Sequence, residues 1–189
     1  MICLRMKASP TALPGVVVLE PKVFGDARGA FFESYRVDTF RALGLGCTFV
    51  QENHSVSTQG VLRGLHYQRR QPQDKLVRVV QGEIFDVAVD IRRGSPTFGK
   101  WVGERLSAEN RKQIFVPVGF AHGFLVLSPT AEVIYKTSDY YCPPEERGIV
   151  WNDPEVGIAW PLNGMTPTVN KRDSEYPRLS AAPKDDLPA

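Results

Sequence analysis

The sequence predicts an all-β jelly roll with short peripheral helices, built from about eight antiparallel strands. From Gly15 onward, short runs of β-branched and aromatic residues recur between clusters of Gly, Pro and Asn. This pattern is typical of a sandwich or barrel and not of alternating helices and strands. The 189 residues are enough for one sizeable core. Such a fold encloses a ligand cavity between its two sheets.

The strands are predicted in order along the chain. Residues 16–19 open the series, and residues 60–68 contain a short apolar run of strand type. Residues 75–81 and 83–91 flank Gly82 and are interpreted as a hairpin. Further strands, each bounded by Pro or Gly, are expected at residues 100–106, 114–116, 121–127 and 132–138. The one convincing helix covers residues 37–43, with Asp38 in its first turn.

The predicted strand 83–91 has two different faces. Phe85, Val87, Val89 and Ile91 alternate with Asp86, Ala88 and Asp90. Because side chains of a strand point alternately to opposite faces, one face is expected to pack and the other to line a wet space.

One domain with two extensions is the expected organisation. Residues 1–14 are interpreted as a loose N-terminal extension, residues 15–179 as a single domain, and residues 180–189 as a flexible C-terminal tail. The tail is expected because the composition becomes Pro-rich and polar beyond Leu162.

Composition excludes several classes of function. The 23 Lys and Arg residues against 21 Asp and Glu leave a net charge of +2 without any basic run, which argues against nucleic-acid binding. No apolar run approaches the ~18 residues that a membrane helix needs. The three cysteines, Cys3, Cys47 and Cys142, have neither paired nor metal-ligand spacing, which favours a reducing compartment. We therefore expect a cytoplasmic protein.

The histidines bear on whether the chain holds a metal. Many barrels of this kind bind one through two His separated by a single residue, but His54, His66 and His122 are all distant in sequence. Distant residues can still converge, so spacing alone leaves a three-histidine site open. No metal or other cofactor is expected, and the chemistry is then acid–base.

Two residues are candidates for proton transfer. His66 lies in the apolar run with Arg63 three residues before it, and a free imidazole titrates at about 6.5, so it can act as a general base. Tyr135 is expected on the same strand face as Val133 and Thr137, and its phenol can donate a proton to an enolate. The alternative for each is a structural side chain with a satisfied hydrogen bond.

Other candidates concern charge. Lys75 could neutralise an oxyanion, with Asp86 on the neighbouring strand of the hairpin as its candidate partner, although a surface Lys is the simpler interpretation. Arg28 and Arg63, with Lys75 and residues 51–53, could donate to a diphosphate. Gly-rich phosphate loops are missing from the chain, so any nucleotide would be held by side chains.

Six ordered segments resemble one known family. They are residues 25–33, 51–55, 60–68, 85–92, 95–101 and 119–125. Between about Gly15 and Leu179 the chain resembles the dTDP-4-dehydrorhamnose 3,5-epimerase family of the cupin superfamily, which implies a cupin-type double-stranded β-helix. The match is loose at residues 169–173, where the family usually has Leu-Ser-x-Lys-Asp.

The resemblance implies epimerisation at carbons 3 and 5 of dTDP-4-dehydro-6-deoxy-D-glucose, on the route to dTDP-L-rhamnose, without metal or nicotinamide. It assigns His66 as the base, Tyr135 as the proton donor on the opposite sugar face, Asp173 as the carboxylate that holds His66, and Lys75 as the stabiliser of the enolate oxygen. The implied substrate-binding residues are Arg28, Glu33, Gln51, Asn53, Arg63, Lys75, His122 and Glu146. The segment 28–33 typically comes from the other subunit, which implies a homodimer with shared active sites.

Three alternatives stay open at this point. A monofunctional 3- or 5-epimerase of a related dTDP-4-keto sugar would use the same residues. A non-catalytic cupin that binds a nucleotide sugar is disfavoured by the joint presence of His66, Tyr135 and Lys75. A metal-dependent cupin oxygenase or isomerase is disfavoured by the missing His-x-His pair.

Overall fold

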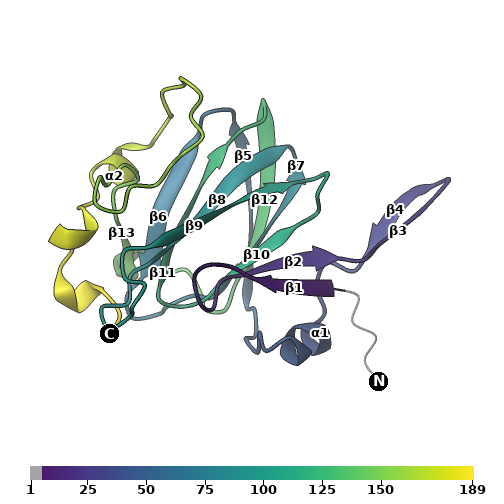
Figure 1. Cartoon of the computed structure of the whole chain (residues 1–189), viewed down its shortest axis with the longest axis horizontal. Helices are drawn as coiled ribbons and strands as arrows, with labels where there is room; N and C mark the ends of the chain where they lie inside the picture. The colour runs from purple at the N-terminus through teal and green to yellow at the C-terminus, as the bar shows by residue number, and fades with distance from the viewer. Residues whose placement is uncertain (1–5) are drawn as a thin grey trace.

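The computed structural model, which describes residues 6–189, has two antiparallel sheets packed face to face (Figure 1). One sheet has the order β1 (Met6–Pro10), β2 (Val17–Pro21), β10 (Gln113–Val116), β7 (Lys75–Gln81), β12 (Thr130–Thr137) and β5 (Gln51–Thr58). The other has the order β13 (Glu146–Gly148), β6 (Leu62–Gln68), β11 (Phe120–Val126), β8 (Glu83–Asp90) and β9 (Trp101–Ser107). The predicted all-β jelly roll is thereby confirmed.

Helices are few and short. The helix expected at residues 37–43 is α1 (Val37–Ala42), with Asp38 in its first turn. The remaining helical elements are α2 (Lys171–Ser174) and the 3₁₀ turns η1 (Pro143–Glu145), η2 (Leu179–Ala181) and η3 (Lys184–Asp186). None of the helices within residues 6–189 is long and apolar enough to cross a membrane.

The space between the sheets is apolar at one end and polar at the other. Along β7 the inward side chains change from Val79 and Val77, which are buried in the core, to Lys75. Along β12 they change in the same direction, from buried Val133 to Thr137. Because alternate residues of a strand share a face, these two short sequences place a dry core and a polar cavity side by side inside one sandwich.

The hairpin expected from residues 75–81 and 83–91 is wrong. β7 pairs with β10 and β12, whereas β8 pairs with β11 and β9 in the opposite sheet. The two strands instead lie in facing sheets, with Val77 and Ile84 in the same buried cluster. The alternation of apolar and polar residues shows which face of a strand each side chain is on, but not which strand lies beside it. The chain can therefore cross from one sheet to the other at Gly82 as well as form a hairpin there.

The C-terminal tail expected to be flexible is docked on the five-stranded sheet. Leu179, Ala182 and Leu187 are buried against the outer face of β8, where Val87 and Val89 point. The Asp186 carboxylate accepts hydrogen bonds from Arg69 and Arg147, each at 3.0 Å. In Figure 1 this segment, in yellow, lies beside β13 and β6. The tail is therefore needed to cover apolar surface that the sheet would otherwise expose.

Replacing Leu187 by Ala should lower the free energy of unfolding by about 2–5 kcal/mol, because a buried Leu side chain is lost from this cluster. Lys184→Ala in the same segment is the matched control, since Lys184 is exposed, and it should change stability by less than about 0.5 kcal/mol. Denaturant midpoints of both variants test this. A Leu187 variant as stable as the control would mean that the segment is not docked in solution.

The N-terminal segment also differs from the loose extension that was expected. β1 pairs with β2 over five residues, and Leu13 is 2% exposed within the core. The run Met6–Pro10 has few β-branched residues, so its strand is formed by pairing with β2 and not by its own propensity. The first five residues, including Cys3, lie outside the described part of the chain, while the thiols of Cys47 and Cys142 are free.

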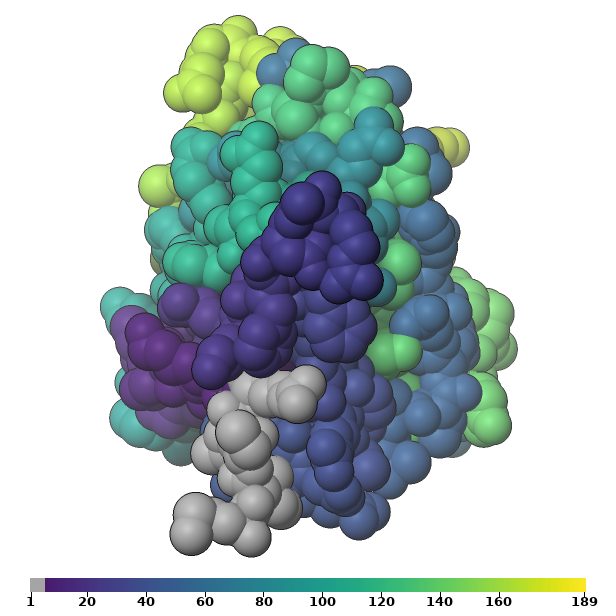
Figure 2. Space-filling model, turned by 90° about the vertical axis from the view of Figure 1, so that its right-hand side faces the viewer, coloured from purple at the N-terminus to yellow at the C-terminus, as the bar shows by residue number. Residues whose placement is uncertain are grey.

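A two-stranded ribbon, β3 (Val23–Asp26) with β4 (Gly29–Phe32), projects from the side of the sandwich (Figure 1). Figure 2 faces this side of the molecule, and the purple ribbon stands in front of the body. Arg28 lies in its turn, and Phe31 is 65% exposed. A large apolar side chain exposed on a projecting ribbon is typical of a surface that contacts another molecule.

Candidate active site

The polar end of the sandwich forms an open cavity of about 380 Å³. Both sheets contribute to it, because β6 and β11 line one side while β5, β7 and β12 line the other. Nine of the residues singled out in the sequence line this cavity: Gln51, Asn53, Arg63, His66, Lys75, His122, Tyr135, Glu146 and Asp173. Polar side chains from two facing sheets therefore converge on a space large enough for a small ligand.

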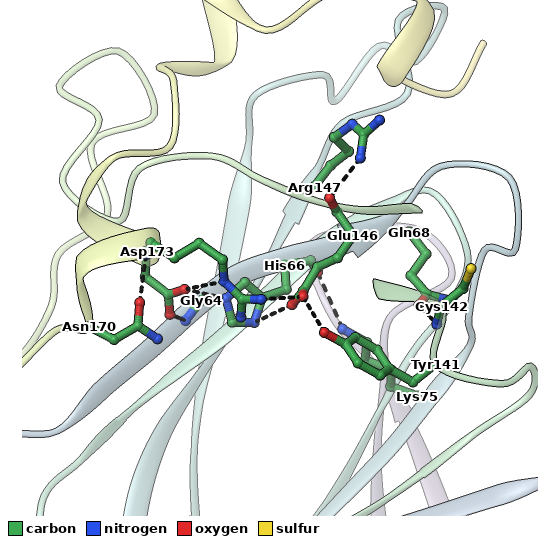
Figure 3. Close-up of polar contacts among 11 residues, drawn as sticks. Gly64, His66, Gln68, Lys75, Tyr141, Cys142, Glu146, Arg147, Asn170 and Asp173 are labelled. Atoms are coloured by element: carbon green, nitrogen blue, oxygen red, sulfur yellow. Dashed lines mark hydrogen bonds and ion pairs between the residues drawn. The ribbon is translucent and has the colours of Figure 1, made fainter. Parts of the chain in front are cut away.

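His66 and Asp173 form a hydrogen-bonded pair at the cavity wall, as Figure 3 shows. His66 Nε2 lies 2.8 Å from Asp173 Oδ1, although the residues are 107 positions apart. The Asp173 side chain is fully buried, and its Oδ2 accepts the Gly64 N–H at 2.9 Å. Asn170 caps helix α2 by accepting the Asp173 N–H at 2.7 Å. Each oxygen of the Asp173 carboxylate therefore has its own hydrogen-bond partner.

The charge of this carboxylate follows from its neighbours. Burial raises the pKa of Asp173, but the hydrogen bond and charge of His66, the N–H of Gly64 and the Arg172 guanidinium together bring it below its usual value. An ionised carboxylate only accepts hydrogen bonds, so His66 must donate its Nε2–H to it. The other ring nitrogen, Nδ1, lies 4.0 Å from Glu146 Oε1 and keeps its lone pair, so it can accept a proton.

Lys75 projects into the cavity from β7, and its Nζ donates to the His66 carbonyl oxygen at 3.3 Å. Burial lowers the pKa of Lys75 to about 8, against the opposing negative charges of Asp86 and Glu146. Asp86 does not pair with Lys75 as expected, because its carboxylate accepts a hydrogen bond from His122 Nε2 at 2.9 Å. At neutral pH the site therefore holds an ammonium group close to His66.

Tyr135 faces His66 from the opposite sheet. It shares its strand face with Val133 and Thr137, as predicted, and these residues lie in the core and the cavity respectively. Burial raises the pKa of Tyr135, with Arg63 opposing and Glu146 adding to the rise. The phenol therefore stays protonated at neutral pH and can act as an acid.

Several cavity residues were not predicted. Tyr141, Arg172, Gln68, Gln73, Ser55 and Asn170 also line the cavity. Glu146 Oε2 accepts hydrogen bonds from Tyr141 at 2.6 Å and from Arg172 at 2.5 Å. Asn170, three residues before Asp173, is a helix N-cap signal that could have identified α2 from the sequence.

Arg28 and Glu33 do not reach this cavity. The Arg28 side chain is 90% exposed and pairs with Asp26 within the β3–β4 ribbon. The Glu33 carboxylate accepts from Thr39 at 3.5 Å. If these two residues bind the ligand of such a cavity, they must do so in a different copy of the chain.

The three histidines do not converge. His66 and His122 are paired across β6 and β11, but His54 points to the outer face of the large sheet and contacts Glu132 at 3.0 Å. Over residues 6–189 no group of three or more His, Cys, Asp or Glu side chains is arranged to hold a metal ion. The groups that the cavity does bring together are an imidazole, a phenol and an ammonium group.

Comparison with known proteins adds to this geometry. Residues 10–181 match the family model described as dTDP-4-dehydrorhamnose 3,5-epimerase. A dTDP-4-dehydrorhamnose 3,5-epimerase from Pseudomonas aeruginosa is 61% identical over 171 residues, which cover 90% of this chain and 94% of that protein.

Two solved structures are informative. The dTDP-6-deoxy-D-glucose-3,5-epimerase from Legionella pneumophila, in complex with dTDP-4-keto-L-rhamnose, superimposes with a TM-score of 0.94 at 48% identity, covering 97% of each chain. A 3′-monoepimerase from Streptomyces bikiniensis, in complex with dTDP-quinovose, gives a TM-score of 0.89 at 36% identity, covering 95% of this chain and 92% of that one.

Proposed function

The chain belongs to the dTDP-4-dehydrorhamnose 3,5-epimerase family, and from this premise we propose how its cavity acts. It is an epimerase that inverts carbons 3 and 5 of dTDP-4-dehydro-6-deoxy-D-glucose and yields dTDP-4-dehydro-L-rhamnose, a step toward dTDP-L-rhamnose. One observation carries the mechanism: His66 and Tyr135 line the same cavity from opposite sheets. A sugar ring held between them presents one face to a base and the other to an acid.

The chemistry proceeds through enolates. Carbons 3 and 5 both flank the C4 ketone, so removing either proton places negative charge on one oxygen. His66 Nδ1 accepts the proton, and the imidazolium formed is stabilised by the ionised Asp173. The Lys75 ammonium stabilises the enolate oxygen. Tyr135 then donates its phenolic proton to the opposite face of the carbon, which inverts the configuration. Before the second inversion His66 releases its proton to solvent and Tyr135 takes one up.

Binding of the nucleotide part uses the remaining polar residues. Gln51, Asn53, Arg63, His122 and Glu146 line the cavity and contact the substrate. Arg28, in the turn of the projecting ribbon, and Glu33, which follows the ribbon, are supplied by a second subunit, so the active enzyme is a homodimer with shared sites. This arrangement is supported by the exposure of Arg28 and by its position outside the cavity of its own chain. The free thiols of Cys47 and Cys142 support a cytoplasmic location.

Incubation with dTDP-4-dehydro-6-deoxy-D-glucose in deuterated water tests the activity. Two inversions place deuterium at both carbon 3 and carbon 5, which NMR of the product resolves. Label at a single carbon would identify a monofunctional epimerase, and an unchanged, unlabelled substrate would leave only a binding function. The relative with 61% identity is a double epimerase and the monoepimerase is 36% identical, which favours label at both carbons.

The rate should fall on the alkaline side as Lys75 loses its proton. Because the pKa of Lys75 is lowered to about 8, the ammonium is present below this pH and disappears as the pH rises through it. We expect kcat/KM to decline above about pH 8 with the slope of a single ionisation. In Lys75→Arg the guanidinium stays charged, so its profile should be flat over this range even if its absolute rate is lower. A Lys75→Arg profile that keeps the decline near pH 8 would assign it to another group.

Arg28→Ala should weaken dTDP binding by roughly 10- to 100-fold, because charge-assisted hydrogen bonds worth about 1.5–3 kcal/mol are removed. Thermal stability should be nearly unchanged, since the Arg28 side chain is exposed. Titration calorimetry with dTDP measures the first effect and thermal unfolding the second.

Mixing Arg28→Ala with His66→Asn tests whether sites are shared. If Arg28 acts in the partner's site, one site of the mixed dimer carries both defects and the other carries none. Subunit exchange should then raise activity at subsaturating substrate above that of either parent. If the subunits are shown to exchange but the activity does not rise, Arg28 acts in the site of its own chain.

A further inference from the structure

We propose that Tyr176 is a positioning residue for His66, holding the imidazole at the angle that presents Nδ1 to the substrate. This inference rests on the proposed role of His66 as the base. It concerns a side chain that does not line the cavity but contacts the His66 ring. Three features of the structure carry it.

The first feature is the ring contact itself. The Tyr176 and His66 rings meet edge to face, with centroids 5.9 Å apart and planes inclined at 73°. This is a favourable geometry for two aromatic rings. The hydrogen bond from Nε2 to Asp173 holds one atom of the imidazole, and Glu146 Oε1 lies 4.0 Å from Nδ1. A ring that tilted further would lengthen the bond to Asp173 and weaken the preference for the Nε2–H tautomer. The contact with Tyr176 limits this tilt.

The second feature is the space that the sequence leaves for the Tyr176 ring. Gly148 on β13 is paired with His66 on β6. A Cβ atom at Gly148 would lie 2.4 Å from both Cδ2 and Cε2 of Tyr176, far inside van der Waals contact. The ring therefore lies directly on the backbone of the strand next to His66, in a slot that only Gly leaves open.

The third feature is that one short segment delivers both partners of His66. Asp173 is in helix α2 and Tyr176 follows three residues later, so the carboxylate and the ring arrive together. The Tyr176 hydroxyl is buried and has no hydrogen-bond partner within residues 6–189. Burial raises the pKa of Tyr176 to about 12, so this hydroxyl stays neutral. The aromatic ring, and not the hydroxyl, is then the part that acts on His66.

Two variants separate the ring from the hydroxyl. Tyr176→Phe keeps the ring and should keep kcat within about twofold, whereas Tyr176→Ala should lower kcat by about 10- to 100-fold, the scale expected when a catalytic group is misplaced. KM should change by less than about threefold in both, since Tyr176 does not line the cavity. Tyr140→Ala is the matched control, because Tyr140 is 61% exposed and outside the cavity, and its kcat should equal that of the wild type.

A spectroscopic readout tests positioning without turnover. The chain has three histidines, so the ¹⁵N shifts of each imidazole can be assigned with single variants. In its neutral form, wild-type His66 should show the tautomer with the proton on Nε2, because Nε2 faces the Asp173 carboxylate. Tyr176→Ala should shift His66 toward a mixture of tautomers, while the outward-facing His54 stays constant as an internal reference.

The outcomes are distinct. A Tyr176→Ala enzyme with wild-type kcat and an unchanged His66 tautomer would overturn the positioning role while leaving the proposed epimerase activity intact. Equal losses in the Phe and Ala variants would also overturn it, because the hydroxyl would then be the active part. If the Ala variant does not fold, Tyr176→Leu keeps apolar volume without a ring edge, and a fully active Leu variant rejects the proposal. A wild-type protein without epimerase activity would reject the function, and the NMR comparison would still test the contact.

Discussion

His66→Asn should lose turnover by at least about 10⁴-fold, the upper end of what general-base catalysis contributes, because Asn cannot accept a proton and His66 serves both carbons. Asn keeps much of the size and polarity of the ring, although its amide overlays Nδ1 and not the Nε2 atom that contacts Asp173. The fold and dTDP binding should therefore be retained, which circular dichroism and calorimetry check. Product formation followed by NMR measures the loss.

Wild-type exchange of substrate protons by His66→Asn would exclude His66 as the base. His54→Asn is the matched control, because His54 lies on the outer face of the sheet and contacts Glu132 instead of the cavity. Its turnover should remain within about twofold of the wild type, as expected for a surface substitution away from the site.

Asp173→Asn should lower kcat by about 10³- to 10⁴-fold, a loss of the size known when the carboxylate that orients a catalytic His becomes an amide. The Gly64 N–H donates to Oδ2, so the amide oxygen of Asn takes that place and the amide nitrogen faces His66 Nε2. Nε2 must then accept a hydrogen bond, which moves the ring proton to Nδ1. The nitrogen that faces the substrate is thereby blocked.

A control variant shows whether replacing any buried carboxylate, and not Asp173 in particular, lowers kcat. Asp153 is 2% exposed and accepts the Leu179 N–H at 2.7 Å, yet it lies outside the cavity. Asp153→Asn should keep kcat within about twofold even if it lowers stability. If Asp173→Asn retains wild-type kcat, His66 does not depend on this carboxylate for its tautomer.

Local pattern was sufficient for most strands and for the orientation of individual side chains. Alternation placed Tyr135 and Val133 on one face of β12, and the predicted helix 37–43 agrees with α1. Strands of mixed or polar composition were missed. β5 is an example, because its cavity-facing residues, Gln51 and Asn53, are hydrophilic and give no apolar period.

Long-range partners could not be predicted from the residues alone. No local rule pairs His66 with Asp173 or sends β7 and β8 to different sheets, because both results depend on how distant segments pack. Family resemblance supplied Asp173 even where the match at residues 169–173 is loose. It could not supply Tyr176, which is defined by the slot at Gly148 and becomes visible only in three dimensions.

In the proposed mechanism one base, His66, removes the protons from both carbon 3 and carbon 5. The most direct test compares deuterium incorporation at each carbon in the wild type and in His66→Asn, with dTDP-4-dehydro-6-deoxy-D-glucose in deuterated water. The wild type should incorporate deuterium at both carbons, and the variant at neither over the same time. Exchange at one carbon that persists at the wild-type rate in His66→Asn would reveal a second base and exclude His66 as the base for that carbon.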